Sequence, residues 1–121
     1  AAGLATLKLV QAPNFYEELT KKTKSLVDGL TKAAHDLDIK FSAQSVGGMF
    51  GMYFSEKAPT SFDEIMKSNK EQFNQFFHHM LSSGFYFGPS AFEAGFVSIS
   101  HTDQDIHQTI EAAKKAFQVL K

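Results

Sequence analysis

The chain has 121 residues, of which 43% are hydrophobic and 21% charged, and its formal net charge is −1. This length supports one compact domain with a core of its own, and the charge indicates neither a polyanion-binding protein nor an acidic tail. All twelve basic residues are lysines and there is no cysteine, so nucleic-acid recognition by arginine, disulfides and cysteine-ligated zinc are not expected.

The first forty residues predict two helices. Residues 1–10 are rich in alanine and leucine and resemble the middle of an apolar helix, which fits either a piece of a larger protein or a trimmed free-standing one. Asn14 and Glu17 form a capping-box pattern that opens the second helix, which closes at residues 36–38. Its apolar stripe has helical spacing and contains Phe15, Leu19, Leu26, Leu30, Ala33 and Leu37.

A hairpin is expected next. Residues 39–44 alternate apolar and polar side chains, and residues 49–54 form a strongly apolar second strand. The glycines in residues 47–51 predict a bend or bulge more than a tight ladder, and they lack the spacing of a nucleotide-binding loop. The longest apolar stretch, residues 46–54, is far shorter than the ~20 residues of a membrane span.

The next segment predicts two helices. Residues 62–66 form a short one, and Ser68 with Glu71 makes a second capping box that opens a longer one, which Gly84 stops. Its broad apolar face contains Phe73, Phe76, Phe77, Met80 and Leu81.

Two short strands, residues 85–87 and 96–99, are expected to flank a loop rich in proline, serine and glycine. Thr102 then caps the last helix, whose first turn carries Asp103 and Asp105, where the helix dipole favours carboxylates.

This order of elements predicts an α+β fold, with a small, mostly antiparallel sheet and helices packed on one face. A ferredoxin-like split βαβ arrangement is the nearest alternative. Because the sequence contains no repeat, linker or low-complexity tract, residues 1–121 are expected to form a single domain.

The histidines do not predict a metal site. His78 and His79 are adjacent on a helix and point about 100° apart, so they cannot both face one ion. Four further candidate ligands lie around the start of the last helix, where their side chains point in different directions. They are His101, Asp103, Asp105 and His107.

The most interesting carboxylate is Glu93, which lies between apolar neighbours in a loop bounded by Pro89 and Gly95. Either it is partly desolvated, as functional carboxylates often are, or it is a solvated loop residue or one that accepts a backbone N–H, and spacing alone favours the second. Four aromatic residues crowd the same loop, more than a small sheet needs, so another domain or subunit is expected to cover part of them: Phe85, Phe87, Phe92 and Phe96. On these residues alone, no complete active site is present.

Three stretches resemble the C-terminal part of the glutamate-1-semialdehyde 2,1-aminomutases, which are pyridoxal-phosphate enzymes of the class III aminotransferase group. They are residues 46–51, residues 88–96 and the stretch from Ser100 to Ala113, and the resemblance extends over essentially the whole chain. The most specific part is Pro-Ser-x-Phe-Glu-Ala-Gly-Phe, residues 89–96. Gly88, where the family often has alanine, and Asp38, where it often has glycine, are mild departures.

The resemblance implies a fold type I homodimer, in which a large domain holds the cofactor and the C-terminal segment forms the small domain. Residues 1–12 would then be a remnant of the interdomain helix. The family isomerises glutamate-1-semialdehyde to 5-aminolevulinate for tetrapyrrole (porphyrin) synthesis in the cytoplasm, or in the plastid stroma of plants. Glu93 matches its active-site carboxylate, which acts by electrostatics and hydrogen bonding.

The family's Schiff-base lysine and phosphate-binding residues lie upstream of these motifs, so the chain alone is expected to bind no pyridoxal phosphate and to be inactive. Two alternatives remain open. One is the small domain of another class III aminotransferase, such as one acting on ornithine. Those enzymes recognise carboxylates with arginine, and this chain contains none, which weighs slightly against that alternative. The other is a free-standing α+β binding module, which would expose polar surfaces where an excised domain exposes apolar ones.

Overall fold

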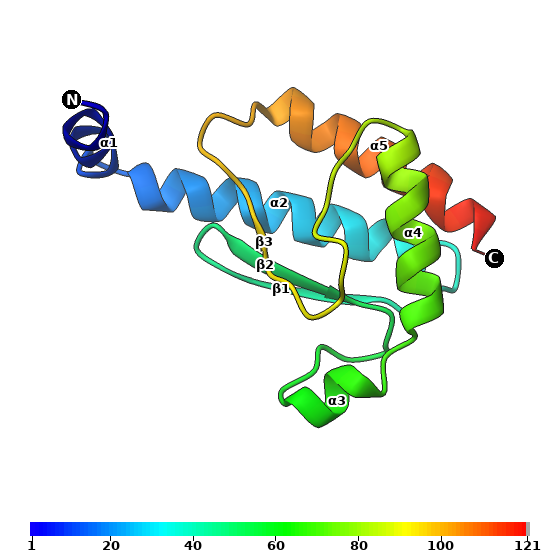
Figure 1. Ribbon diagram of the computed structural model, residues 1–121. Coiled ribbons are helices and arrows are strands. Elements are labelled where there is room, and N and C mark those ends of the chain that lie inside the picture. Colours follow the sequence, from blue (N-terminus) through cyan, green and yellow to red (C-terminus); the bar gives the residue numbers. More distant parts are fainter. Residues whose placement is uncertain (121) are drawn as a thin grey trace.

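The structure is a computed structural model that describes residues 1–120. Over these residues the chain forms five helices and three strands, which confirms the predicted α+β class (Figure 1). In chain order they are α1 (Ala2–Val10), α2 (Phe15–His35), β1 (Ser42–Val46), β2 (Met49–Tyr53), α3 (Phe62–Met66), α4 (Lys70–Ser82), β3 (Gly95–Phe96) and α5 (Asp103–Val119). None of the described helices combines the length and the apolar character that crossing a membrane requires.

The long helices α2, α4 and α5 lie on one side of the sheet, as predicted, whereas the short helix α3 does not. α2 lies along both β1 and β2 and also packs against α5, which in turn contacts α4 (Figure 1). α1 extends from the start of α2, and α3 lies at the opposite side of the sheet from α2 (Figure 1). The opposite face of the sheet is therefore left for the loops and α3.

Aromatic rings from both layers form the centre of the core. Phe41, just before β1, lies 5.2 Å from the Phe117 ring of α5, and Phe117 stacks on Phe76 of α4 at 4.8 Å. All three are at most 1% exposed, and the predicted stripe of α2 supplies Leu26, Leu30 and Ala33 to the same cluster. Most of the phenylalanines at regular spacing are thus core residues.

The hairpin is more regular than the sequence suggested. β1 and β2 pair antiparallel without interruption, from Ser42 opposite Tyr53 to Val46 opposite Met49, so the predicted bend or bulge is absent from this pair. Gly47 and Gly48 form a two-residue turn, and Gly47 takes the left-handed φ of 56° that such a turn requires. The first strand begins at Ser42, not at residue 39, and packing holds the residues before it, since Ile39 and Phe41 are buried in the core.

Two of the predicted helix caps are wrong. Asn14 precedes α2 but has φ 63°, and its side chain accepts no hydrogen bond from the helix, because capping requires an extended backbone at that position. Ser68 instead donates to the Ile65 carbonyl, and Asn69 caps α4 by accepting the Gln72 N–H at 3.0 Å.

The predicted cap of α5 is confirmed. The Thr102 hydroxyl accepts the Asp105 N–H, and the Asp105 carboxylate accepts the Thr102 N–H in return, which completes a capping box. This cap fixes where α5 begins.

The predicted strand at residues 85–87 is absent. Phe85 donates its N–H to Met80 at the end of α4, and Phe87 is buried with its ring 6.2 Å from that of Phe50, so packing and not a ladder holds this segment. The other predicted strand is reduced to Gly95–Phe96, which pairs antiparallel with β2. The sheet thus has the order β1-β2-β3.

Candidate functional site

The loop that precedes β3 is held by its own hydrogen bonds. Ser90 accepts two N–H groups, that of Phe92 through its hydroxyl at 3.2 Å and that of Glu93 through its carbonyl at 3.0 Å. The next residue, Ala91, is buried and fixes the loop against the core. A short turn therefore presents Glu93 in a defined direction.

Glu93 is exposed, which agrees with the solvated alternative of the sequence analysis. Its side chain lies back over the start of the loop. A Cβ atom at Gly88 would stand 3.0 Å from the Glu93 Oε2 and 3.2 Å from the Glu93 Cβ. A side chain at position 88 would therefore crowd Glu93 in this conformation.

Glu93 borders a hollow of about 300 Å³ on the face of the sheet that the large helices leave open. The hollow lies between the sheet, the loop and α3. The residues that line it are Gln44, Ser45, Val46, Met49, Phe50, Gly51, Tyr53, Ile65, Ala91, Phe92, Glu93 and Ala94. Among these described residues Glu93 alone carries a charge, so an electrostatic effect on a bound group would come from its carboxylate.

Tyr53 and Gln44 reach the same hollow, which spacing in the sequence did not reveal. The Tyr53 hydroxyl occupies the space above Gly51, where a Cβ atom would lie only 2.5 Å from it. Gln44 is opposite Gly51 in the hairpin register. The expected hairpin is the signal that could have found them, because its pairing places Gln44 and Tyr53 on the same face of the sheet.

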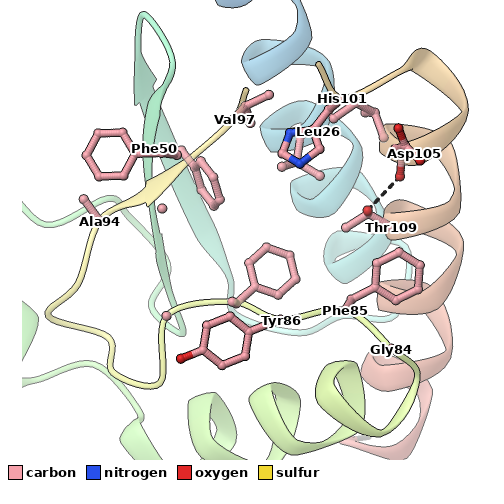
Figure 2. Close-up of a pocket in the computed structure, with 15 residues that line it drawn as sticks. Leu26, Phe50, Gly84, Phe85, Tyr86, Ala94, Val97, His101, Asp105 and Thr109 are labelled. Carbon is pink, nitrogen blue, oxygen red and sulfur yellow. Dashed lines mark hydrogen bonds between the residues drawn. The ribbon is translucent and has the colours of Figure 1, made fainter. Parts of the chain in front are cut away.

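A larger hollow of about 410 Å³ lies on the other side of this loop and does not include Glu93 (Figure 2). Phe85 and Tyr86 lie on one side, and His101, Asp105 and Thr109 lie near α5 (Figure 2). Its polar groups are engaged in local structure, since the His101 Nδ1 accepts the Ser98 N–H and Thr109 donates to the Asp105 carbonyl.

One carboxylate at this larger hollow, that of Asp105, has a shifted pKa, and the cause is the helix cap. Hydrogen bonds from the Thr102 N–H and hydroxyl hold the pKa of Asp105 below its usual value. The Asp105 carboxylate thus serves the helix cap. Within residues 1–120, no three histidine, aspartate or glutamate side chains come together as a metal site.

The loop aromatics divide between the core and the surface. Phe87 is buried, whereas Phe92 is 46% and Phe96 71% exposed. Phe92 also packs against Phe62 of α3, with ring centroids 5.6 Å apart. The predicted exposed aromatic surface therefore consists of fewer residues than the sequence suggested.

The described residues do not fit a pyridoxal-phosphate site of their own. None of the described lysines is buried, whereas a Schiff-base lysine needs a pocket that shields the imine from water. The best enclosed of them, Lys22, uses its ammonium group to bind the carbonyls of Ile99 and His101. No cofactor chemistry is therefore assigned to this chain alone.

The fold is similar to parts of solved transaminases. An ω-transaminase from Sphaerobacter thermophilus matches with a TM-score of 0.79 at 14% identity, over 97% of this chain and 26% of that chain. A glutamate-1-semialdehyde aminomutase from Pseudomonas aeruginosa PAO1 matches with a TM-score of 0.76 at 13% identity, over 88% of this chain and 23% of that chain. The fold is that of an α+β domain found in transaminases and related enzymes.

Sequence similarity relates the chain to one kind of enzyme within this class. The chain is 61% identical over all its 121 residues to the glutamate-1-semialdehyde 2,1-aminomutase of Dechloromonas aromatica, and it spans 28% of that protein's length. It is 56% identical over 117 residues to the enzyme of the same name from Laribacter hongkongensis, again spanning 28% of its length. No protein-family model matches the chain. The sequence is that of a segment of the glutamate-1-semialdehyde 2,1-aminomutase family, about a quarter of its members' length.

Proposed function

We propose that this chain is the C-terminal small domain of a glutamate-1-semialdehyde 2,1-aminomutase. The whole enzyme would isomerise glutamate-1-semialdehyde to 5-aminolevulinate in tetrapyrrole biosynthesis. The observation that carries this proposal is the 61% identity over every residue of the chain to an enzyme of that name.

Pyridoxal phosphate is the cofactor of the proposed whole enzyme. The part of the polypeptide outside this chain would bind it, because the described lysines are unsuited to do so. When bound, the cofactor supplies an electron sink for chemistry at the substrate's amino-bearing carbon. The domain described above would contribute shape and charge beside it.

Glu93 is the residue that we assign to the substrate side of this domain. It is exposed, it lies on a turn fixed by Ser90, and it alone is charged among the described residues that line its hollow. A fixed carboxylate attracts the positive charge of an amino group and accepts hydrogen bonds from it, at no cost of reorganisation. The proposed role is electrostatic and hydrogen-bonding, without covalent chemistry.

The test is Glu93→Gln in the intact enzyme. The amide keeps the shape of the side chain but removes its charge, so we expect cofactor binding to persist and kcat to fall by roughly 10²-fold, as when one electrostatic contact to a transition state is lost. Absorbance of the bound cofactor and steady-state kinetics measure the two effects. Glu71→Gln, at another exposed glutamate on α4, is the matched control and should leave both unchanged.

Unchanged kinetics in Glu93→Gln would remove Glu93 from the site. Loss of the bound cofactor in the same variant would also contradict the assignment, because Glu93 is proposed to act on the substrate and not to hold the cofactor.

The remaining parts of the proposal concern the whole protein. Residues 1–12 would belong to the helix between the two domains, which suits α1, because three of its leucines are more than half exposed and none of its residues is buried. A free-standing module would not be expected to expose such a helix. We further propose a homodimer that resides in the cytoplasm.

A further inference from the structure

The turn that carries Glu93 is stabilised by a hydrogen bond to the Ser90 side chain. The Ser90 carbonyl accepts the Glu93 N–H at 3.0 Å, which closes a turn over residues 90–93. Inside that turn the Ser90 Oγ accepts the Phe92 N–H at 3.2 Å. A serine hydroxyl that bonds the backbone N–H two residues further on imitates a backbone turn and holds the segment in place. Both hydrogen bonds within this turn therefore come from one residue.

The two residues between Ser90 and Glu93 are anchored to different parts of the domain. Ala91 is buried in the hydrophobic core, and the Phe92 ring lies 5.6 Å from that of Phe62 of α3. The Cα–Cβ bond of Glu93 leaves the backbone directly after these anchors. The conformation of the turn therefore decides which way the Glu93 side chain points.

A fixed backbone matters for a charge that acts on a substrate. Stabilisation of a developing charge is largest when the opposing group is preorganised, because no energy is then spent in moving it during the reaction. Glu93 is exposed and lies on a loop, and loops are the more mobile parts of a fold. Without the Ser90 hydroxyl, the Phe92 N–H would bond to water instead, and the turn would open more easily.

We infer that Ser90 is a positioning residue for Glu93 in the intact enzyme. Its hydroxyl keeps the turn closed, and the closed turn holds the Glu93 carboxylate at the hollow that it borders. Ser90 is not among the residues that line this hollow, so it acts through Glu93 and not by contact with the substrate. The inference rests on the proposed function, because it needs a Glu93 that faces the substrate.

The chain offers a control with the same local chemistry. In the loop after β3, the Ser98 hydroxyl accepts the Ser100 N–H, again two residues further on and again at 3.2 Å. Ser98 does not line the hollow that Glu93 borders. Ser98→Ala therefore removes an equivalent hydrogen bond from a segment that does not carry Glu93.

The first experiment compares Ser90→Ala and Ser98→Ala in the intact enzyme. We expect kcat to fall roughly fivefold in Ser90→Ala, the size of effect that one hydrogen bond has, with the absorbance of the bound cofactor unchanged. Ser98→Ala should keep the parent kcat. Ser90→Thr and Ser90→Asn should recover most of the rate, because both side chains accept a backbone N–H in the same kind of turn.

Three results of this comparison would overturn the inference. They are an unchanged kcat in Ser90→Ala, an equal loss in Ser98→Ala, and failure of both the threonine and the asparagine variant to recover the rate. Ser90→Cys, whose sulfur is only a weak acceptor, provides the same test if the alanine variant does not fold.

The second experiment shows whether Ser90 acts through Glu93. Ser90→Ala is combined with Glu93→Gln, and the double variant is compared with the two single ones. A positioning residue loses its effect once the group that it positions has lost its charge, so we expect the double variant to have the kcat of Glu93→Gln alone. A purely structural role would give the same loss in both backgrounds and would overturn the inference.

These outcomes are separable from those for Glu93. An impaired Glu93→Gln with a normal Ser90→Ala would leave the assigned role of Glu93 standing and remove that of Ser90. An unchanged Glu93→Gln would remove Glu93 from the site, and with it the route by which Ser90 is proposed to act.

Discussion

At the scale of single residues, close contacts to glycine fix the geometry of the loop and strand that carry the candidate site. Gly95, at the start of β3, is opposite Phe50, and a Cβ atom there would lie 2.3 Å from that buried ring. At Gly88 a Cβ atom would lie 3.0 Å from the Glu93 Oε2, a tighter contact than usual that the flexible Glu93 side chain can relieve by a small shift. The sequence shows these glycines, but not which side chain each one accommodates.

Gly95→Ala is therefore expected to destabilise the domain. The Phe50 ring is 5% exposed and enclosed by the core, so it cannot move aside cheaply, and overpacking of this kind costs about 1–3 kcal/mol. Urea unfolding of the 121-residue chain, followed by circular dichroism, measures the loss. The control is Gly3→Ala in α1, where the new Cβ meets no atom within 4 Å. Equal losses in both variants would contradict this explanation.

At the scale of elements, capping hydrogen bonds decide where the helices begin. The box between Thr102 and Asp105 opens α5, whose Phe117 completes the aromatic core. A cap that fails at α2 and shifts by one residue at α4 shows that the sequence pattern alone is a weaker guide. Backbone conformation before the helix decides whether the side chain can reach the free N–H groups.

Thr102→Ala should cost about 1 kcal/mol of stability, because it removes the hydroxyl that accepts the Asp105 N–H. Thr20→Ala is the control: that hydroxyl donates to the Tyr16 carbonyl within the exposed part of α2 and caps nothing. Urea midpoints of the two variants make the comparison. Thr20→Ala falling as far as Thr102→Ala would argue against the cap as the cause.

The contribution of Asp105 should depend on pH. Its pKa in the folded chain is lowered by the Thr102 N–H and hydroxyl, so the ionised form is favoured by folding. The stabilisation is therefore complete above the unfolded pKa and is lost as the pH falls through the lower folded value. Asp105→Asn should melt below the parent chain at neutral pH, and this gap should close under acidic conditions, below about pH 4. A gap that is constant with pH would rule this linkage out.

At the scale of the whole molecule, the fold and the sequence carry different information. The ω-transaminase and the aminomutase match with TM-scores of 0.79 and 0.76, so the architecture alone does not separate them. The 61% sequence identity over the full chain to the Dechloromonas aromatica protein is what relates it to the aminomutases. The fold is therefore shared with transaminases, whereas the similarity to the aminomutases rests on the sequence.

The 121-residue chain by itself should show no cofactor absorbance that survives dialysis against buffer after addition of pyridoxal phosphate. Its described lysines are exposed or half-buried, so any imine formed with them would hydrolyse readily. The intact enzyme, treated in the same way, is the positive control. A dialysis-resistant band in the short chain would show that it holds a cofactor site and would contradict this account.

The sequence by itself determined the α+β class, the helix pattern and the aromatic core, because apolar periodicity is local and strong. It also drew attention to Glu93 through the proline and glycine residues around it. Only the tertiary structure decided that residues 85–87 pack into the core instead of pairing in the sheet, and that Val46, Met49 and Phe96 share one exposed face beside Glu93. Strand register and side-chain contacts join residues far apart in the chain, and no local pattern specifies them.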